Sequence, residues 1–415
     1  MSIIPHLRRV VTDYFKTLLA DRTFCLFLLL IFLNGVVTAP FLPFLPVYVD
    51  EGLGLGQTFT ADFRTISLLL MAAFVLLGGV VSDRLGPKRT MLLGLVGTPL
   101  AAAVFMIASP SLLLGLAVAR GIAEGLLNGG GQTYLVASAP ATRLSAATAL
   151  YFLGHTLGSA LGSPIGAAVL ERGSFFDLGL IMLIAGAPIL LAVMLLLSEA
   201  PGRAAKSLAV IDVLKGYLAI AGRRHVWTLA LMQFLRTTFT GVATLAIPFL
   251  LHDLTGSKHV VGWFTSVSLV AGMLSMIVVG RISDRTGRRR IVGFCIIGTG
   301  LASAVLALCA GSAVGLFLCG TVAMTAAWTL SGQVTPLAKE MSEPGEEGRL
   351  VGMILFPWAL GMLVGARIHG LMSQSQPGLM FGVTTLLLLA AWGLTRFMFR
   401  TMVDGAATER RGCSG

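Results

Sequence analysis

The chain has 415 residues, of which 56% are hydrophobic and only 12% are charged, and its mean hydropathy is +0.88. Soluble globular domains carry about 25% charged residues, so this composition excludes that class and predicts a protein embedded in a lipid bilayer. The formal net charge of +11 does not indicate a nucleic-acid partner, because the Lys and Arg residues concentrate in particular loops and at the two ends of the chain.

Twelve apolar stretches of about 20 residues follow one another, each long enough as a helix to cross the hydrocarbon layer. Long continuous stretches favour helices over a membrane β-barrel, which uses short alternating segments. The predicted fold class is therefore an all-α membrane protein with twelve transmembrane helices. The expected spans are 23–49, 60–82, 90–108, 111–137, 145–170, 177–197, 226–251, 260–282, 291–309, 312–337, 349–372 and 378–400.

The longest polar break divides these spans six and six. We expect an N-terminal segment at 1–22, a six-helix half at 23–197, a linker at 198–225, a second six-helix half at 226–400 and a tail at 401–415. Most Lys and Arg residues lie in the terminal segments, the linker and two short loops, which the positive-inside rule assigns to the cytoplasmic side. Residues 1–22 are basic and no small-residue cleavage site follows them, so we expect them to be retained.

A charged loop occurs twice, after the second and after the eighth expected span. The first copy reads Gly79-Val-Val-Ser-Asp83-Arg84-Leu-Gly86-Pro-Lys88-Arg89, and the second reads Gly280-Arg-Ile-Ser-Asp284-Arg285-Thr-Gly287-Arg-Arg289-Arg290. The copies lie 201 residues apart, and Gly131-Gln132 matches Gly332-Gln333 at the same offset. This self-similarity indicates a duplicated six-helix unit.

The loop resembles the Gly-x-x-x-Asp-Arg-x-Gly-x-Lys/Arg-Lys/Arg signature of the major facilitator superfamily, and the resemblance covers nearly the whole chain. It implies two pseudo-symmetric six-helix bundles and transport by alternating access. It also implies that the loops act as cytoplasmic gates, although ordinary stop-transfer charge is the alternative. The gating residues would be Gly79, Asp83, Arg84, Gly86, Lys88, Arg89, Gly280, Asp284, Arg285, Gly287, Arg289 and Arg290.

The fourth span carries Arg120, Glu124, Asn128 and Gln132 at spacings of four, which places them on one helix face. The positions 201 residues later hold Thr321, Thr325, Thr329 and Gln333, without charge. An ionised side chain in hydrocarbon costs at least about 2.5 kcal/mol, so Arg120 and Glu124 should pair. We expect the stripe to line the transport path, and a structural helix contact is the alternative.

Proton coupling is expected at Glu124, with Arg120 tuning its pKa, because Arg120 resembles a recurring arginine of proton-coupled family members. His155 could also carry a proton, since the reference pKa of histidine is about 6.5, or it could be a neutral packed residue. Arg367 and His369 near the end of the eleventh span are expected only to reach toward the membrane interface.

Further polar residues are candidates for the substrate cavity. Asn34 and Asn128 are the only asparagines of the chain, and each could bind substrate or join helices. Arg236 lies near the middle of the seventh span with Gln233 and requires an anionic partner, which could be Glu124 or a substrate carboxylate or phosphate. The cavity set is Asn34, Asn128, Gln132, Gln233, Arg236, Thr325, Thr329 and Gln333.

The fifth span contains a small-residue face that permits close helix approach, with a proline that removes one backbone donor. This face resembles the fifth-helix motif of drug:proton antiporters, except that Pro164 comes one position late and Ala167 replaces a glycine. Pro40, Pro43 and Pro46 resemble the proline-rich segment of the same branch, and a broken helix end is the alternative. The packing motif comprises Gly154, Gly158, Gly162, Pro164 and Gly166.

The leading hypothesis is a monomeric, proton-coupled antiporter that exports a small organic molecule across a bacterial inner membrane, with both termini cytoplasmic. One alternative is transport of an anionic metabolite or metal chelate in either direction, and another is a transporter-like scaffold or sensor. No enzyme motif occurs. No cofactor or metal is expected, because the five cysteines, Cys25, Cys295, Cys309, Cys319 and Cys413, lack metal-ligand spacing.

Overall fold

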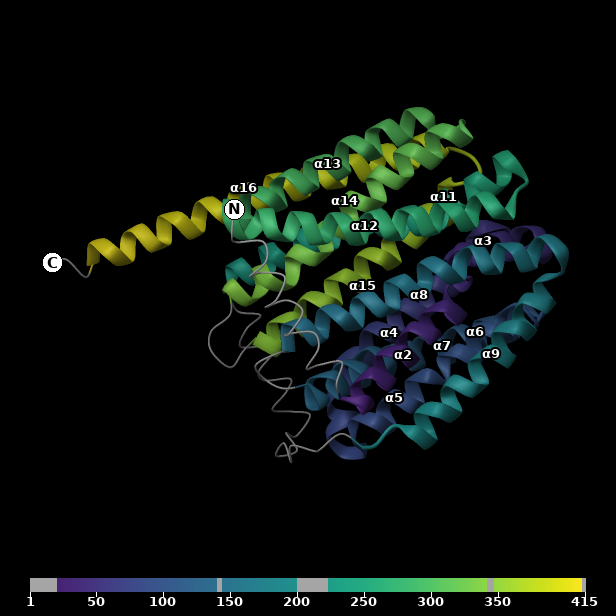
Figure 1. Cartoon of the computed structure of the whole chain (residues 1–415). Helices are drawn as coiled ribbons and strands as arrows, with labels where there is room; N and C mark the ends of the chain where they lie inside the picture. Colours follow the sequence, from purple (N-terminus) through teal and green to yellow (C-terminus); the bar gives the residue numbers. More distant parts are fainter. Residues whose placement is uncertain (1–20, 140–143, 200–222, 342–346, 413–415) are drawn as a thin grey trace, which may run out of the picture. The chain divides into compact units, whose positions relative to one another are not determined.

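The structure is a computed structural model that describes residues 21–139, 144–199, 223–341 and 347–412. The predicted N-terminal segment, most of the predicted linker and Cys413 lie outside these ranges. All regular structure in the described ranges is helical (Figure 1), which confirms the predicted fold class. The elements are α2 (Arg22–Thr38), α3 (Phe41–Val47), η1 (Tyr48–Gly52), α4 (Gly56–Leu85), α5 (Pro87–Leu95), α6 (Gly97–Val104), α7 (Pro110–Ser138), α8 (Leu144–Arg172), α9 (Phe175–Leu196), α11 (Arg224–Thr255), α12 (Lys258–Thr286), α13 (Arg288–Cys309), α14 (Ala313–Met341), α15 (Glu347–Met372) and α16 (Pro377–Gly412).

Within the described ranges, nine helices are long and apolar enough to cross a membrane, and they correspond to nine of the twelve expected spans. The fifth and eleventh spans are α8 and α15, which are 29 and 26 residues long. The third span is divided into α5 and α6, since Pro99 has no backbone N–H to donate across the break at Val96.

Two other spans differ from their expected limits. The first is divided into α2, α3 and a π-helical turn η1, because its prolines interrupt the helical hydrogen bonds. The last, expected at 378–400, continues as α16 to Gly412 through most of the predicted tail. The tail contains no proline, so every residue there can donate the backbone N–H that a helix needs.

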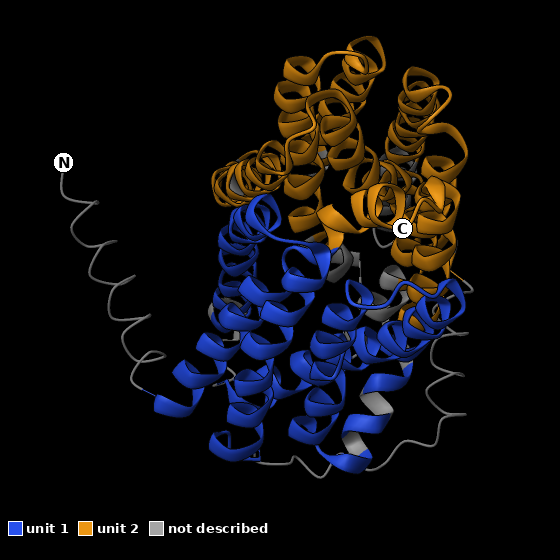
Figure 2. Ribbon diagram, turned by 90° about the vertical axis from the view of Figure 1, so that its right-hand side faces the viewer, with its two compact units in different colours: residues 1–41, 73–208 blue, residues 42–72, 209–415 orange. Residues whose placement is uncertain are grey.

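The chain forms two compact units (Figure 2). The first unit comprises Met1–Phe41 and Ala73–Leu208, and the second comprises Leu42–Ala72 and Ala209–Gly415. Residues 42–72 precede the linker in sequence, yet they belong to the second unit.

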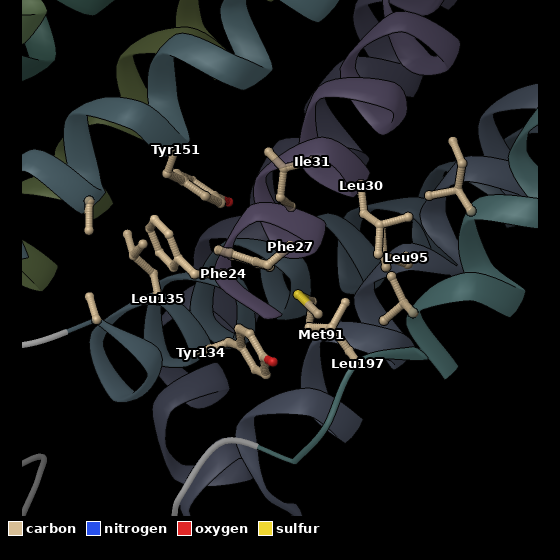
Figure 3. Packing of buried hydrophobic residues seen from close by; sticks show 14 residues of the cluster. Phe24, Phe27, Leu30, Ile31, Met91, Leu95, Tyr134, Leu135, Tyr151 and Leu197 are labelled. Carbon is tan, nitrogen blue, oxygen red and sulfur yellow. The ribbon is translucent and has the colours of Figure 1, made fainter. Parts of the chain in front are cut away.

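The core of the first unit lies where α2 packs on α8 and α9, and where α5 packs on α7. Its aromatic centre is Phe27, whose ring stacks on Tyr151 at 5.8 Å and packs at 4.9 Å from Tyr134 (Figure 3). Met91 and Leu95 bring α5 into the same cluster. The buried aromatic area holds the helices of this unit together.

In the second unit, α11 is the central helix. Its span is 83% buried, against 33–44% for the other candidate spans, because α14, α15 and α16 surround it. The core around α11 joins Val226 and Leu229 to Val292 and Ile296 of α13 and Leu330 of α14. A polar residue in the buried part of α11 is therefore surrounded mainly by protein atoms.

Candidate functional site

The two charged loops adopt the same turn in the two units. Gly86, between α4 and α5, has φ of +90°, and Gly287, between α12 and α13, has φ of +93°. Each donates its N–H to a serine carbonyl four residues earlier, Ser82 at 2.9 Å and Ser283 at 3.0 Å. Only glycine adopts this positive φ readily, which explains why both copies carry it.

Part of each predicted gate is described. Lys88 donates to the Met194 carbonyl of α9 at 2.9 Å, and this bond ties the first loop to its own unit. Arg84, Arg89 and Arg290 are exposed. The structure describes only the helical backbone of five gate residues, Gly79, Asp83, Asp284, Arg285 and Arg289. The charge contacts of the gates at these positions therefore stay a prediction.

The stripe on α7 begins with an ion pair. Arg120 Nη1 lies 2.8 Å from Glu124 Oε2, and the Arg120 guanidinium lies 3.7 Å from the centroid of the Phe41 ring. Asn128 is exposed and donates to the Glu124 backbone carbonyl at 2.9 Å, while Gln132 is half-buried. The charge of Arg120 is thus balanced locally, although its buried Nε has no hydrogen-bond partner among the described residues.

The other candidates in the first unit have different surroundings. Asn34 is 3% exposed and accepts from the Thr98 hydroxyl at 2.6 Å, which joins α2 to α6. His155 is exposed on α8 and is close enough to Glu124 for an electrostatic interaction with it. The first unit therefore brings together the three residues predicted for proton coupling, whereas Asn34 joins two helices.

Arg236 of the second unit is among the largest fully buried side chains in the described ranges and is 1% exposed. Its Nε and Nη2 donate to Gln233 Oε1 at 3.2 and 3.0 Å, and its Nη1 donates to the Ala327 carbonyl at 3.2 Å and to the Ser331 hydroxyl at 2.9 Å. These partners are all neutral. A guanidinium has five N–H groups, so one N–H and the whole positive charge remain available to an anion.

The α14 residues of the predicted cavity set lie on the same helix as Ala327, whose carbonyl accepts from Arg236. Thr329 donates to Ser275 of α12 at 2.8 Å or to the Thr325 carbonyl at 2.7 Å, and Gln333 is 3% exposed. Thr329 therefore joins helices. Thr325 is half-buried, and on α11 the buried Thr240 hydroxyl has no hydrogen-bond partner among the described residues.

The glycine motif of α8 lies against α2. A Cβ atom at Gly158 or Gly162 would overlap the backbone carbonyl of Phe32 or Val36. Gly154 has more room, since the nearest atom to such a Cβ would be the Leu28 carbonyl at 3.7 Å. The second unit has an equivalent seam that the sequence comparison did not identify: Gly361 and Gly365 of α15 lie against Phe234 and Thr238 of α11.

Sequence reasoning also missed a polar cluster in the second unit, which we call the η1 cluster. It joins the segment 42–72 to α11, α12 and α15. Contrary to the expectation that His369 reaches the membrane interface, its side chain is fully buried, because it bonds to Gln57. The other contacts are Glu51 with Lys258 and His252 at 2.9 and 3.3 Å, Asp62 with Arg367, Asp50 with Gln374 at 3.0 Å, and Thr58 with the Gly370 carbonyl at 3.2 Å.

The sequence does contain one signal for this cluster. Asp50, Glu51 and Asp62 are acidic residues around the first loop, and the ends of later spans near Lys258 and Arg367 are basic. Opposite charges on loops at one side of a predicted bundle favour contact, but only the structure identifies the partners.

The sequence profile of the Major Facilitator Superfamily matches residues 27–235 and 229–411. Among curated proteins, the chain is 30% identical over 216 residues and over 209 residues to two proteins of Agrobacterium vitis that are named for tartrate transport. These matches cover 46% and 44% of this chain and 47% and 48% of the relatives. The chain thus spans about half the length of the curated relatives it matches.

Solved transporter structures have the same fold at low sequence identity. A mutant of the nucleoside transporter NupG has a TM-score of 0.76 and 14% identity, with 91% of this chain and 100% of that chain covered. A bacterial homologue of the human lysosomal transporter Spinster, inward-facing and unoccupied, has a TM-score of 0.72 and 14% identity over 92% of this chain and 97% of that one. A peptide-bound POT family transporter has a TM-score of 0.74 and 15% identity over 92% and 96%.

Proposed function

The chain belongs to the Major Facilitator Superfamily of membrane transporters, and on this premise we propose that it carries a small organic anion bearing carboxylate groups by alternating access. The observation that carries the proposal is Arg236, a buried cation on the central helix α11 whose described partners are all neutral. Burying a charge without a counter-charge is costly, and a substrate carboxylate would offset that cost. The relatives named for tartrate transport favour the same substrate class.

The proposal is tested by ligand-induced stabilisation of the purified protein. Tartrate and its uncharged diamide are compared, because they differ in charge but little in shape. Tartrate is expected to raise the melting temperature in a saturable way, since a ligand that binds only the folded state stabilises it. The diamide is expected to have little effect. Equal stabilisation by tartrate and its diamide would contradict carboxylate binding. So would the absence of stabilisation by tartrate and by every member of a panel of dicarboxylates.

Proton coupling at the Arg120–Glu124 pair is part of the proposal. The pair is supported by the 2.8 Å contact and by the electrostatic interaction of Glu124 with His155. Glu124 would accept a proton when the pair opens, and Arg120 would compensate its charge when it closes.

The Glu124→Gln variant is expected to fold and to bind substrate but to lose transport driven by a pH gradient, because an amide cannot carry the proton. Exchange of labelled for unlabelled substrate without a gradient should persist. The assay uses reconstituted vesicles with an imposed pH gradient, and Glu171→Gln is the control for loss of one carboxylate on α8. Gradient-driven transport at the wild-type rate in the Glu124 variant would remove Glu124 from the mechanism.

Export in exchange for protons is the direction that we propose, on the resemblance of the α8 glycine motif to that of antiporters. The same vesicles decide the direction. For an antiporter, a gradient that is acidic on one side drives substrate toward that side, whereas a symporter carries substrate away from it. Location in a bacterial inner membrane with both termini cytoplasmic, and a monomeric state, remain predictions for this integral membrane protein.

A further inference from the structure

A buried imidazole lies outside the transport chemistry proposed above. His369 on α15 is fully buried, and its Nε2 lies 2.9 Å from Gln57 Oε1 on α4. Gln57 is 1% exposed, and its amide Nε2 donates to the Pro46 carbonyl at 3.0 Å. This second bond fixes the orientation of the amide, so its oxygen faces His369. His369 Nε2 must then carry the ring proton and donate it.

The other ring nitrogen, Nδ1, is consequently an acceptor, and it has no hydrogen-bond partner within the described ranges. The ring packs edge to face against Phe249 of α11, with centroids 6.0 Å apart. The neutral ring fits this site. A second proton on Nδ1 would add a buried donor and a positive charge with nothing to accept them, which is costly.

The charged and titratable groups on the surrounding elements are largely engaged with one another. Arg367 pairs with Asp62, Glu51 pairs with Lys258 and lies within reach of His252, and Asp50 accepts from Gln374. Others on these elements include Asp253 of α11, which is exposed, Arg64 of α4, Tyr48 of η1 and Arg236 of α11, which are buried, and His259 of α12, which is half-buried. None of these groups bonds to the His369 ring in the described structure, so a charged ring would find no ready counter-ion.

A cavity lies close to this region. A cavity of about 400 Å³ is lined by Phe249, which packs on the His369 ring, and by Ser373, whose N–H donates to the His369 carbonyl at 3.0 Å. Asp50 and Gln374 of the η1 cluster line the same cavity. The cavity therefore comes within one helical turn of the imidazole.

We propose that the Gln57–His369 contact is a proton-operated latch: a proton on His369 Nδ1 charges the buried ring, and the cost of keeping that charge away from water favours release of the segment 42–72 from α15. The remaining contacts of the segment include exposed ion pairs such as Asp62 with Arg367, which contribute little individually. Buried apolar side chains such as Phe44, Leu45 and Phe63 also hold the segment, and the latch is the contact within this attachment that a proton can change, which makes one conformational step of the transporter sensitive to pH.

The sign and size of the effect follow from linkage. The closed latch accommodates only the neutral ring, whereas a released histidine takes up a proton near pH 6.5. Acid therefore favours the open form, and lowering the pH from 7.5 to 5.5 should raise the ratio of open to closed latch by up to about tenfold.

The test measures the distance between spin labels at Gly52 and Leu371, two exposed positions on the two sides of the latch, in a cysteine-free background in lipid nanodiscs. The wild type should gain a longer-distance population on acidification. The His369→Gln variant, which keeps a neutral amide but cannot be protonated, should lose that response. His252→Gln is the matched control: it removes the histidine near Glu51 and should leave the response unchanged.

A second variant keeps the proposal testable if His369→Gln does not fold. Gln57→Glu supplies a carboxylate that would pair with a protonated ring, so acid should then hold the latch closed instead of opening it. A wild type whose distances do not change with pH would overturn the proposal. So would a pH response that survives in His369→Gln, disappears in His252→Gln, or keeps its wild-type sign in Gln57→Glu.

Discussion

Replacing Arg236 with glutamine is expected to lower the affinity for a dicarboxylate by about 10- to 100-fold. The variant removes the charge and the free N–H donor that a carboxylate would use, and charge-assisted hydrogen bonds contribute about 1.5–3 kcal/mol. A loss of about 1.4 kcal/mol corresponds to about 10-fold in the dissociation constant, and a loss of about 2.8 kcal/mol to about 100-fold. Titration calorimetry with tartrate on wild-type and variant protein measures it directly.

Two further arginine variants give this measurement its controls. Arg236→Lys keeps the charge but loses the planar fork, so it should fall between the wild type and Arg236→Gln. Arg396→Gln removes an exposed arginine of the same unit, which lies over the Trp392 ring, and should leave the affinity unchanged. If Arg236→Gln folds and binds tartrate like the wild type, then Arg236 only joins α11 to α14 and the substrate class is wrong.

The Gly162→Ala variant is expected to be strongly destabilised, by about 1–3 kcal/mol or more. The added methyl group would overlap the Val36 carbonyl, which belongs to the rigid backbone of α2, so the two helices must separate. Gly154→Ala is the matched control on the same helix face. Its methyl group would lie 3.7 Å from the Leu28 carbonyl, an ordinary contact, so it should be neutral or slightly stabilising.

Thermal unfolding of the two purified variants, followed by intrinsic fluorescence, measures the difference. Gly365→Ala tests the same seam in the second unit, where the methyl group would overlap the Thr238 carbonyl, and it should behave like Gly162→Ala. Equal stability of Gly162→Ala and Gly154→Ala would mean that α8 and α2 are not packed as closely as the structure has them.

The sequence predicts those parts of the site that depend on a local pattern of residues. Spacings of four placed Arg120 and Glu124 on one face, and the structure has them 2.8 Å apart. Arg236 was expected to have an anionic partner, whereas the structure surrounds it with a carbonyl, an amide and a hydroxyl. The groups that surround a buried charge depend on how α11 packs against α14. This packing cannot be read from the sequence of α11 alone.

The limits of the repeat have a similar origin. The offset of 201 residues predicted matching turns at Gly86 and Gly287, and their φ angles agree within a few degrees. The glycines of the two packing seams, Gly158 with Gly361 and Gly162 with Gly365, are instead 203 residues apart, so a fixed offset did not find the second seam. Turns depend on consecutive residues, whereas seams depend on where two separate helices meet.

By itself, the sequence determined that this protein is a duplicated bundle of membrane helices of the Major Facilitator Superfamily, because hydropathy, helix length and the repeated loop are local properties that the bilayer constrains strongly. Only the tertiary structure decided that residues 42–72 belong to the second unit and that His369 is buried against Gln57. These contacts join residues 312 positions apart in the chain, and they form because helix packing leaves a buried polar group no partner other than the one opposite it.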